Sequence, residues 1–147
     1  MCWQTLSDFV ETHAPRKIII ARDLNIVLDQ KEKRGGIPSR DQMLPFVEDL
    51  IQLWDLLDIK PKKGLYTWTN NRSREDHIAA RLERFLLQSS LLLDKRIVIS
   101  KILPKFASNH KPILLQITKE ENLGPIPFWF SPLWIKQEGF WETVTKA

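Results

Sequence analysis

Three short polar segments interrupt otherwise apolar stretches of the sequence, and they contain the residue types that phosphate chemistry requires. They are Asp23 with Asn25, Arg81 with Glu83, and Asn109 with His110. A carboxylate accepts a proton from water or approaches a metal ion, and a carboxamide donates to a phosphoryl oxygen. A histidine that donates a ring N–H to a carboxylate is held in one tautomer and favoured as imidazolium, which suits a phosphate anion. The three segments favour chemistry at a phosphate group if the fold brings them together.

Each segment also has a purely structural interpretation. Alternate residues of an extended strand point the same way, so Asp23 and Asn25 are expected to face one pocket. Asp-x-Asn is equally a turn sequence that caps a strand, and spacing alone favours the turn. Nothing in the spacing shows that His110 meets Glu83. The basic group of Arg72, Arg74 and Arg81 either contacts a phosphate backbone or forms a solvated surface.

The composition is that of a mildly basic globular domain. The chain has 147 residues, of which 43% are hydrophobic, and its formal net charge is +4. This length fits one domain, and the charge is compatible with a nucleic-acid partner. The single cysteine, Cys2, cannot form an internal disulfide. No apolar run approaches the ~18 residues of a membrane span, and no signal-peptide pattern is present, so we expect an intracellular protein without a membrane partner.

Two helices and a strand are predicted in the first part of the chain. Apolar residues at helical spacing predict an amphipathic helix over residues 2–13. A β-branched run predicts a buried strand over residues 17–21, which ends just before Asp23. A second helix is predicted to begin at Ser39, where Gln42 completes an S-x-x-Q capping box. Its apolar stripe should pack against a sheet.

The second part of the chain is predicted to consist mainly of strands. Residues 65–70, 97–103 and 112–118 are rich in β-branched and aromatic residues. Residues 78–88 are ambiguous, because their helix propensity favours a helix while their alternation permits a strand. Residues 124–147 are predicted to form a loop followed by an amphipathic helix.

The order of these segments resembles a known superfamily. The sequences IIIARDLNIVLDQKEKRGG, LYTWTNNR, IAARLERFLL and ASNHKPILLQI are similar to the C-terminal half of the endonuclease/exonuclease/phosphatase superfamily. They are most similar to the endonuclease domains of plant LINE-type (non-LTR) retrotransposon polyproteins. The trailing PFWFSPLWIKQEGFWETV resembles the segment that joins such an endonuclease to its reverse transcriptase. The resemblance divides the chain into residues 1–120, half of an endonuclease-like domain, and residues 121–147, a linker and amphipathic helix.

The resemblance implies a fold and a partner. The family fold is an α/β layered sandwich of two sheets, so this chain is expected to form its C-terminal half, with a mainly antiparallel sheet and flanking helices. One face of that sheet would then be unburied over more than the few hundred Å² that monomers tolerate. We therefore expect either a partner on this face, such as the missing N-terminal half or a second copy of the chain, or a marginally stable product of a decayed element.

The resemblance also implies Mg²⁺-dependent hydrolysis of DNA phosphodiesters and a role for each motif residue. Asp23 would activate water, Asn25 and His110 would contact the phosphate, and Glu83 would orient His110. Nucleic acid would be contacted by Trp68, Asn70, Arg72, Arg74 and Arg81. For Trp68, packing in the core is an equal alternative.

Several residues depart from the family pattern. Arg22 replaces the glycine before Asp23, and Glu83 replaces an aspartate, which shifts the carboxylate by about 1 Å and is enough to slow catalysis ~10²-fold. Asn109 stands where the family has an aspartate near the metal, which removes a negative charge from a site for a hard cation. Together with the missing glutamate of the N-terminal half, this predicts a truncated, degenerate endonuclease with weak or lost catalysis. The alternatives are a non-catalytic nucleic-acid-binding or interaction module and an inert remnant. Because the family acts on chromosomal DNA, the resemblance implies that the protein is located in the nucleus.

Overall fold

The computed structural model describes residues 3–38, 40–93, 96–119 and 140–145, which form a mixed α+β fold. Its elements are α1 (Trp3–His13), β1 (Ile19–Asp23), η1 (Gln30–Glu32), β2 (Lys33–Arg34), α2 (Leu44–Leu53), β3 (Leu56–Asp58), β4 (Trp68–Thr69), η2 (Arg74–Asp76), β5 (Ala79–Ala80), β6 (Glu83–Gln88), η3 (Ser89–Leu91), β7 (Arg96–Ile102), β8 (Ile113–Lys119) and α3 (Phe140–Thr145). The strands of the described residues form three small antiparallel sheets. The predicted combination of antiparallel sheets and helices is therefore confirmed.

The central sheet has the strand order β1-β6-β3. In β6, every residue from Arg84 to Leu87 is buried. This settles the ambiguity of residues 78–88, which form strands β5 and β6 and no helix. A strand that is buried on both faces and paired on both edges overrides the helix propensity of its leucines and arginine, because tertiary packing outweighs local preference.

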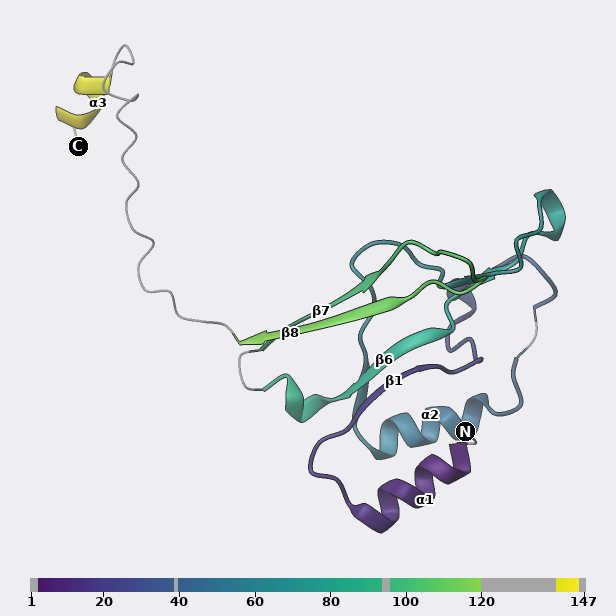
Figure 1. The fold of residues 1–147 in the computed structure, drawn as a ribbon. Helices are drawn as coiled ribbons and strands as arrows, with labels where there is room; N and C mark the ends of the chain where they lie inside the picture. Colours follow the sequence, from purple (N-terminus) through teal and green to yellow (C-terminus); the bar gives the residue numbers. More distant parts are fainter. Residues whose placement is uncertain (1–2, 39, 94–95, 120–139, 146–147) are drawn as a thin grey trace.

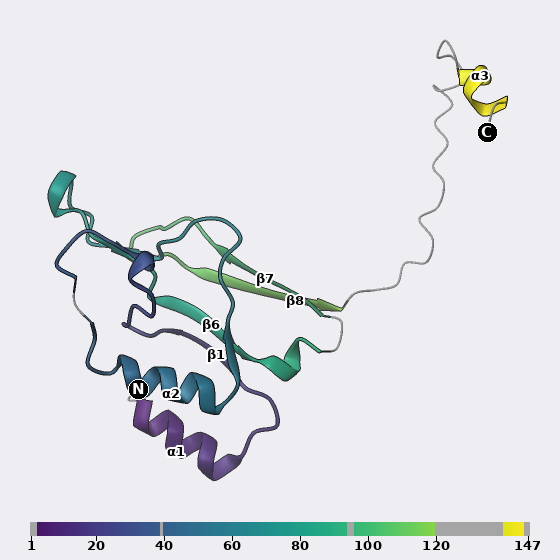
Figure 2. The ribbon, with the colours of Figure 1, turned by 180° about the vertical axis from the view of Figure 1, so that it is seen from behind.

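Figures 1 and 2 show that α1 and α2 lie on one face of β1 and β6, and that the β7–β8 hairpin lies on the other. The helical side holds the larger core, in which Ile20 of β1 and Leu86 of β6 meet Val47 and Leu50 of α2. The hairpin side holds a smaller core around Phe85 and Leu87 of β6. The central sheet is therefore the middle layer of three.

The helix over residues 2–13 is confirmed as α1, but the predicted start of the second helix is wrong. Ser39 lies outside the described residues, and α2 begins only at Leu44, without a side-chain cap. Before it, Asp41 accepts a hydrogen bond from the Met43 N–H at 2.8 Å, which forms a turn. Pro45 favours the first helical turn that follows, because its fixed φ suits that position. The turn at Asp41 therefore replaces the capping box.

The strand predictions hold with small shifts. The strand predicted over residues 17–21 is β1, displaced by two residues toward Asp23. The strands predicted over 97–103 and 112–118 are β7 and β8, each displaced by one residue. Of residues 65–70, only Trp68 and Thr69 form a strand, which pairs with β5.

An ionic cluster, defined here as Glu32, Asp58, Arg81 and Arg84, joins the small β2-β5-β4 sheet to the central sheet. Arg84 lies 2.5 Å from Glu32 and 2.8 Å from Asp58, and Arg81 lies 3.0 Å from Glu32 and also contacts Asp58. The two arginine side chains are no more than 1% exposed. The prediction that Arg81 contacts a nucleic-acid phosphate is therefore wrong, because two carboxylates already hold its guanidinium inside the protein.

Apolar side chains remain exposed beside the smaller core. Ile19 and Leu57 both pair with Leu87, so all three share one face of the central sheet. Leu87 is fully buried, whereas Ile19 is 48% and Leu57 43% exposed. The β7–β8 hairpin thus covers the middle of this face and leaves its margins open.

Only α3 is described in the predicted linker and helix of residues 121–147, and the rest lies outside the described residues. No helix in the described ranges has both the length and the apolar character needed to cross a membrane.

Candidate carboxylate–histidine site

The site begins with two carboxylates on neighbouring strands. Asp23 ends β1 and Glu83 begins β6, and the antiparallel register places them directly opposite each other. Directly opposite residues of an antiparallel pair share a face, with Cβ atoms about 5 Å apart. The pairing of β1 with β6 therefore brings together two acidic side chains from distant parts of the sequence.

His110 completes the group from a third segment. It precedes β8 and forms an isolated antiparallel bridge with Trp68 of β4. Its Nδ1 atom lies 2.5 Å from Oε1 of Glu83 and 3.7 Å from Oδ2 of Asp23. The His110 and Asp23 side chains are 41% and 33% exposed, whereas that of Glu83 is 12% exposed. The three predicted residues thus meet at the protein surface, with Glu83 as the most buried member.

Glu83 is positioned through the backbone by Thr67. The Thr67 side chain is fully buried, and its Oγ1 accepts hydrogen bonds from the N–H groups of Leu82 and Glu83 at 2.9 and 3.2 Å. One carboxylate oxygen of Glu83, Oε1, meets His110. The other, Oε2, is buried and has no hydrogen-bond partner among the described residues. A buried carboxylate oxygen without a partner is unfavourable unless a cation or a water molecule satisfies it.

Asn25 does not follow the extended geometry assumed for it. Its backbone φ of 53° lies in the left-handed region, and its N–H donates to Oδ1 of Asp23 at 2.8 Å. The alternation of side chains therefore stops at Asp23, and Asp23 caps the strand end as the turn interpretation predicts. Asn25 still lies beside Asp23, because both line one groove.

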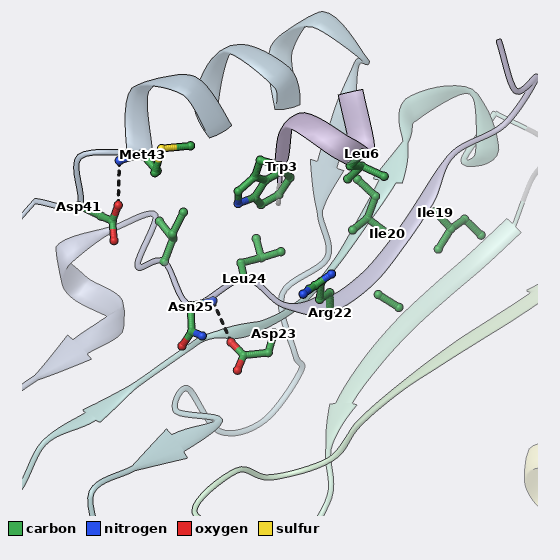
Figure 3. Close-up of a pocket in the computed structure, with 12 residues that line it drawn as sticks. Trp3, Leu6, Ile19, Ile20, Arg22, Asp23, Leu24, Asn25, Asp41 and Met43 are labelled. Carbon is green, nitrogen blue, oxygen red and sulfur yellow. Dashed lines mark hydrogen bonds between the residues drawn. The ribbon is translucent and has the colours of Figure 1, made fainter. Parts of the chain in front are cut away.

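The groove, of about 610 Å³, runs along β1 from the site toward the helices. Figure 3 shows Trp3 and Leu6 of α1 on its helical side, with Leu24 pointing toward Trp3. Asp23 and Asn25 lie at its polar end, with Asp41 and Met43 nearby (Figure 3). The groove therefore combines polar residues, including Arg22 beside Asp23, with apolar side chains on its helical side.

Trp68 lies close to the site and is half-buried. Its ring centroid is 6.4 Å from that of His110, with an angle of 59° between the planes. Trp68 thus restricts the His110 ring on one side while part of its own surface remains accessible.

The predicted nucleic-acid residues of the segment after β4 belong to a projecting loop, which Figure 1 shows in teal at the upper right. Asn70 organises this loop, since its Oδ1 accepts from the N–H groups of Arg72 and Ile78 and its Nδ2 donates to Asp76. Arg72 and Arg74 are exposed on it. Their positions are compatible with a phosphate contact, unlike that of Arg81.

Asn109 faces this loop. Its Oδ1 accepts a hydrogen bond from Nδ2 of Asn71, and Asn71 in turn accepts from Nζ of Lys105 at 2.7 Å. The Asn109 carbonyl also accepts the Thr69 N–H at 3.1 Å. The side-chain oxygen predicted at a degenerate metal position is therefore engaged in holding two loops together.

The site can be tested against the Mg²⁺ that the sequence resemblance implies. Asp23, Glu83 and His110 each offer one ligand atom, and these atoms lie within 4.8 Å of one another. Mg²⁺ is usually held by one or two carboxylates with water completing its shell. Two carboxylates, one with an unpartnered buried oxygen, fit that requirement.

Sequence reasoning missed Thr67 and Asn71, which position the site without taking part in its chemistry. Thr67 lies between aromatic residues in a strand-like segment, where a polar residue that points inward must find buried partners. The position of a polar residue between two aromatic ones was therefore the sequence signal that could have identified Thr67. The sequence holds no such signal for Asn71, because the role of Asn71 depends on its contact with Asn109.

The fold and site define a mixed α+β protein with a carboxylate–histidine cluster at the end of its central sheet. Comparisons of the chain with models of protein families, with curated proteins and with solved structures found no match. The resemblance to retrotransposon endonucleases therefore rests on the sequence motifs.

Proposed function

We propose that the chain is a degenerate relative of a Mg²⁺-dependent DNA endonuclease, whose remaining site binds a phosphodiester and hydrolyses it weakly or not at all. The observation that carries this proposal is the convergence of Asp23, Glu83 and His110, with Nδ1 of His110 2.5 Å from Glu83 and 3.7 Å from Asp23. A carboxylate that accepts a proton, beside a histidine oriented by a second carboxylate, is suited to the attack of water on phosphorus.

Each side chain has a defined part in this chemistry. Oδ1 of Asp23 is engaged by the Asn25 N–H, so Oδ2 is the oxygen that accepts a proton from water. Glu83 binds Nδ1 of His110, which fixes the ring and leaves Nε2 for a phosphate oxygen. Asp23 and Glu83 would hold Mg²⁺, which supplies neutralisation of the charge that develops on the phosphate.

The same geometry supports the weak catalysis that we propose. Asn109 brings no charge to the site, and its amide oxygen is bonded to Asn71. The two carboxylates are therefore the anionic ligands that the described residues offer to a metal there. Misplacement of a catalytic group by about 1 Å can slow a reaction ~10²-fold. The side chain of Glu83 is longer than the aspartate of the family pattern, so it would lower the rate further.

Nicking of supercoiled plasmid in the presence of Mg²⁺ tests the proposal. Asp23→Asn keeps an oxygen that can accept the Asn25 N–H but removes the proton acceptor, and it should abolish any nicking by the unaltered protein. Asp29→Asn is the matched control, because Asp29 caps a turn in the same way at an exposed position outside the site. Equal nicking by the unaltered protein and Asp23→Asn would exclude hydrolysis at this site.

A second candidate function is non-catalytic binding of nucleic acid, favoured by the exposed Arg72 and Arg74 on the projecting loop. Lys105 lies at the base of that loop, bonded to Asn71. Affinity that falls steeply with salt and does not need a metal would identify this function.

The proposed endonuclease relative also has a protein partner, which binds the open margins of the central sheet marked by Ile19 and Leu57. This partner is either an N-terminal half of the endonuclease type or a second copy of the chain.

A further inference from the structure

The charges of the chain are separated between the two outer layers of the fold. Residues 3–15 and 41–58, which contain α1 and α2, hold seven aspartates and glutamates and no lysine or arginine. Residues 59–74 and 96–119, which contain β4, β7 and β8, hold ten lysines and arginines and no aspartate or glutamate. The helices and the β7–β8 hairpin lie on opposite sides of β1 and β6 (Figures 1 and 2). One outer layer is therefore acidic and the other basic, although the net charge of the chain is only +4.

The two basic segments run side by side. The backbone N–H of Lys62 donates to the Ser100 carbonyl at 3.1 Å, and that of Lys111 donates to the Thr67 carbonyl at 2.7 Å. These hydrogen bonds hold the turn over residues 61–64 against β7. The lysines of the turn and of the strand consequently belong to one surface.

A groove of about 370 Å³ lies between this turn and the end of β7. This lysine groove is lined by Lys62, Lys63, Lys101, Ile102 and Leu103. Its three lysines are exposed, and the described residues that line it include no carboxylate. Three ammonium groups beside two aliphatic side chains fit a ligand that carries carboxylates around an apolar centre.

The acidic layer has a surface of that kind on α2. Leu53 is 72% exposed, and the exposed Asp49 lies one turn before it on the same side of the helix. Glu48 is exposed as well. The last turn of α2 has no basic side chain to offset the partial negative charge of its terminal carbonyl groups. The C-terminal half of α2 thus presents an apolar side chain among negative groups.

We propose that the lysine groove of one chain binds the C-terminal half of α2 of a second copy, with Leu53 in the groove and Asp49 beside the lysines. The central sheet separates the two surfaces within a chain, so a chain cannot satisfy its own groove. The contact is heterologous, and each added copy leaves one groove and one α2 surface free for the next. It uses neither the carboxylate–histidine site nor the open margins of the central sheet, so it does not depend on the proposed function.

Sedimentation velocity of the full chain, freed of nucleic acid, tests this inference. At about 0.01 M salt we expect the average mass to rise with protein concentration and to exceed that of two chains. At about 1 M salt it should fall toward that of one chain, because the Debye length decreases from ~30 Å to ~3 Å. Lys62→Glu/Lys101→Glu and Glu48→Lys/Asp49→Lys each place like charges across the contact and should weaken association at least ~10-fold.

A matched control and a rescue experiment separate the contact from general charge effects. Lys31→Glu/Arg34→Glu makes the same change in net charge as the groove variant, at exposed residues outside both surfaces, and should associate like the unaltered protein. Mixing the groove variant with the α2 variant should restore association, because the unaltered α2 of one then meets the unaltered groove of the other. Circular dichroism of each variant checks that lost association does not result from unfolding.

Three results would overturn the inference. The first is a single-chain mass at every protein concentration in low salt, and the second is a dimer that both double variants retain. The third is an unaltered protein that stays monomeric while the groove variant loses affinity for duplex DNA, since the lysine groove would then serve a nucleic acid. Failure of Mg²⁺-dependent nicking would count against the proposed function only.

Discussion

The ionic cluster makes the stability of the protein depend on Glu32 and on pH in a defined direction. Burial alone would raise the pKa of Glu32, but hydrogen bonds and charge from Arg84, together with Arg81, outweigh it and hold that pKa below its ordinary value. A carboxyl whose pKa is lowered by folding stabilises the protein above its unfolded pKa, near 4.3. That stabilisation is lost as the pH falls from there through the lowered folded pKa.

Glu32→Gln tests this directly. The side chain is 3% exposed and forms ion pairs with both arginines, so its neutral replacement leaves Arg81 and Arg84 with Asp58 as their one remaining carboxylate in the cluster. Removing one member of a buried ion-paired group typically destabilises a protein by about 3–5 kcal/mol. This is a large part of the ~5–15 kcal/mol that stabilises an ordinary domain. We expect a loss of that size at pH 7.

Urea unfolding followed by tryptophan fluorescence measures the effect, with the buried Trp54 as a reporter. The difference between the unaltered protein and Glu32→Gln should shrink as the pH falls below about 4, because Glu32 is then protonated in the unfolded state and, at still lower pH, in the folded protein as well. Glu48→Gln is the matched control, since its partner Arg40 is 67% exposed and surface pairs contribute ~0–1 kcal/mol. A change below ~1 kcal/mol at pH 7 in Glu32→Gln, or parallel pH profiles, would refute the reasoning.

Two further substitutions test the positioning of the loops and of Glu83. Gly35→Ala places a Cβ 2.1 Å from the His77 carbonyl oxygen at a φ of +73°, so it should lower the melting temperature well beyond Gly64→Ala, where φ is +78° but the nearest atom is 3.3 Å away. Equal melting temperatures for the two variants would show that the loop near His77 yields easily. Thr67→Val removes the acceptor of the Leu82 and Glu83 N–H groups and should lower the free energy of unfolding by about 1–3 kcal/mol, measured in urea. Thr12→Val on the exposed face of α1 should change it by no more than ~0.5 kcal/mol, and a similar small effect at Thr67 would contradict the role assigned to it.

The elements that the sequence predicted correctly are those whose pattern is local. The spacing of apolar residues in α1 and the β-branched runs of β7 and β8 are visible within a dozen residues. The start of α2 was mispredicted because the S-x-x-Q pattern competes with a turn at Asp41 and with Pro45, whose fixed φ suits the first helical turn.

Some features of the candidate site could likewise be predicted from the sequence, and others could not. Asp23, Glu83 and His110 could be predicted from residue type and from the order of the motifs, and the fold brings them together. The burial of Arg81 could not be predicted, because its partners Glu32 and Asp58 lie far away in the sequence and look like ordinary surface charges. The turn geometry of Asn25 could be predicted, because Asp-x-Asn is a turn sequence and the hydrogen bond to Asp23 that fixes it is local.

The central place of β6 in its sheet has a consequence for how the chain folds. Its partners come from β1, where Ile20 pairs with Leu86, and from β3, where Leu57 pairs with Leu87. Pairing with β1 closes a loop of about 65 residues before any stabilising contact of that pair is gained, and this entropy loss slows folding. The β7–β8 hairpin, by contrast, joins neighbouring segments and can form early. We therefore expect the hairpin to form before the central sheet, and the carboxylate–histidine site, which needs the β1–β6 pair, to assemble only in the last steps of folding.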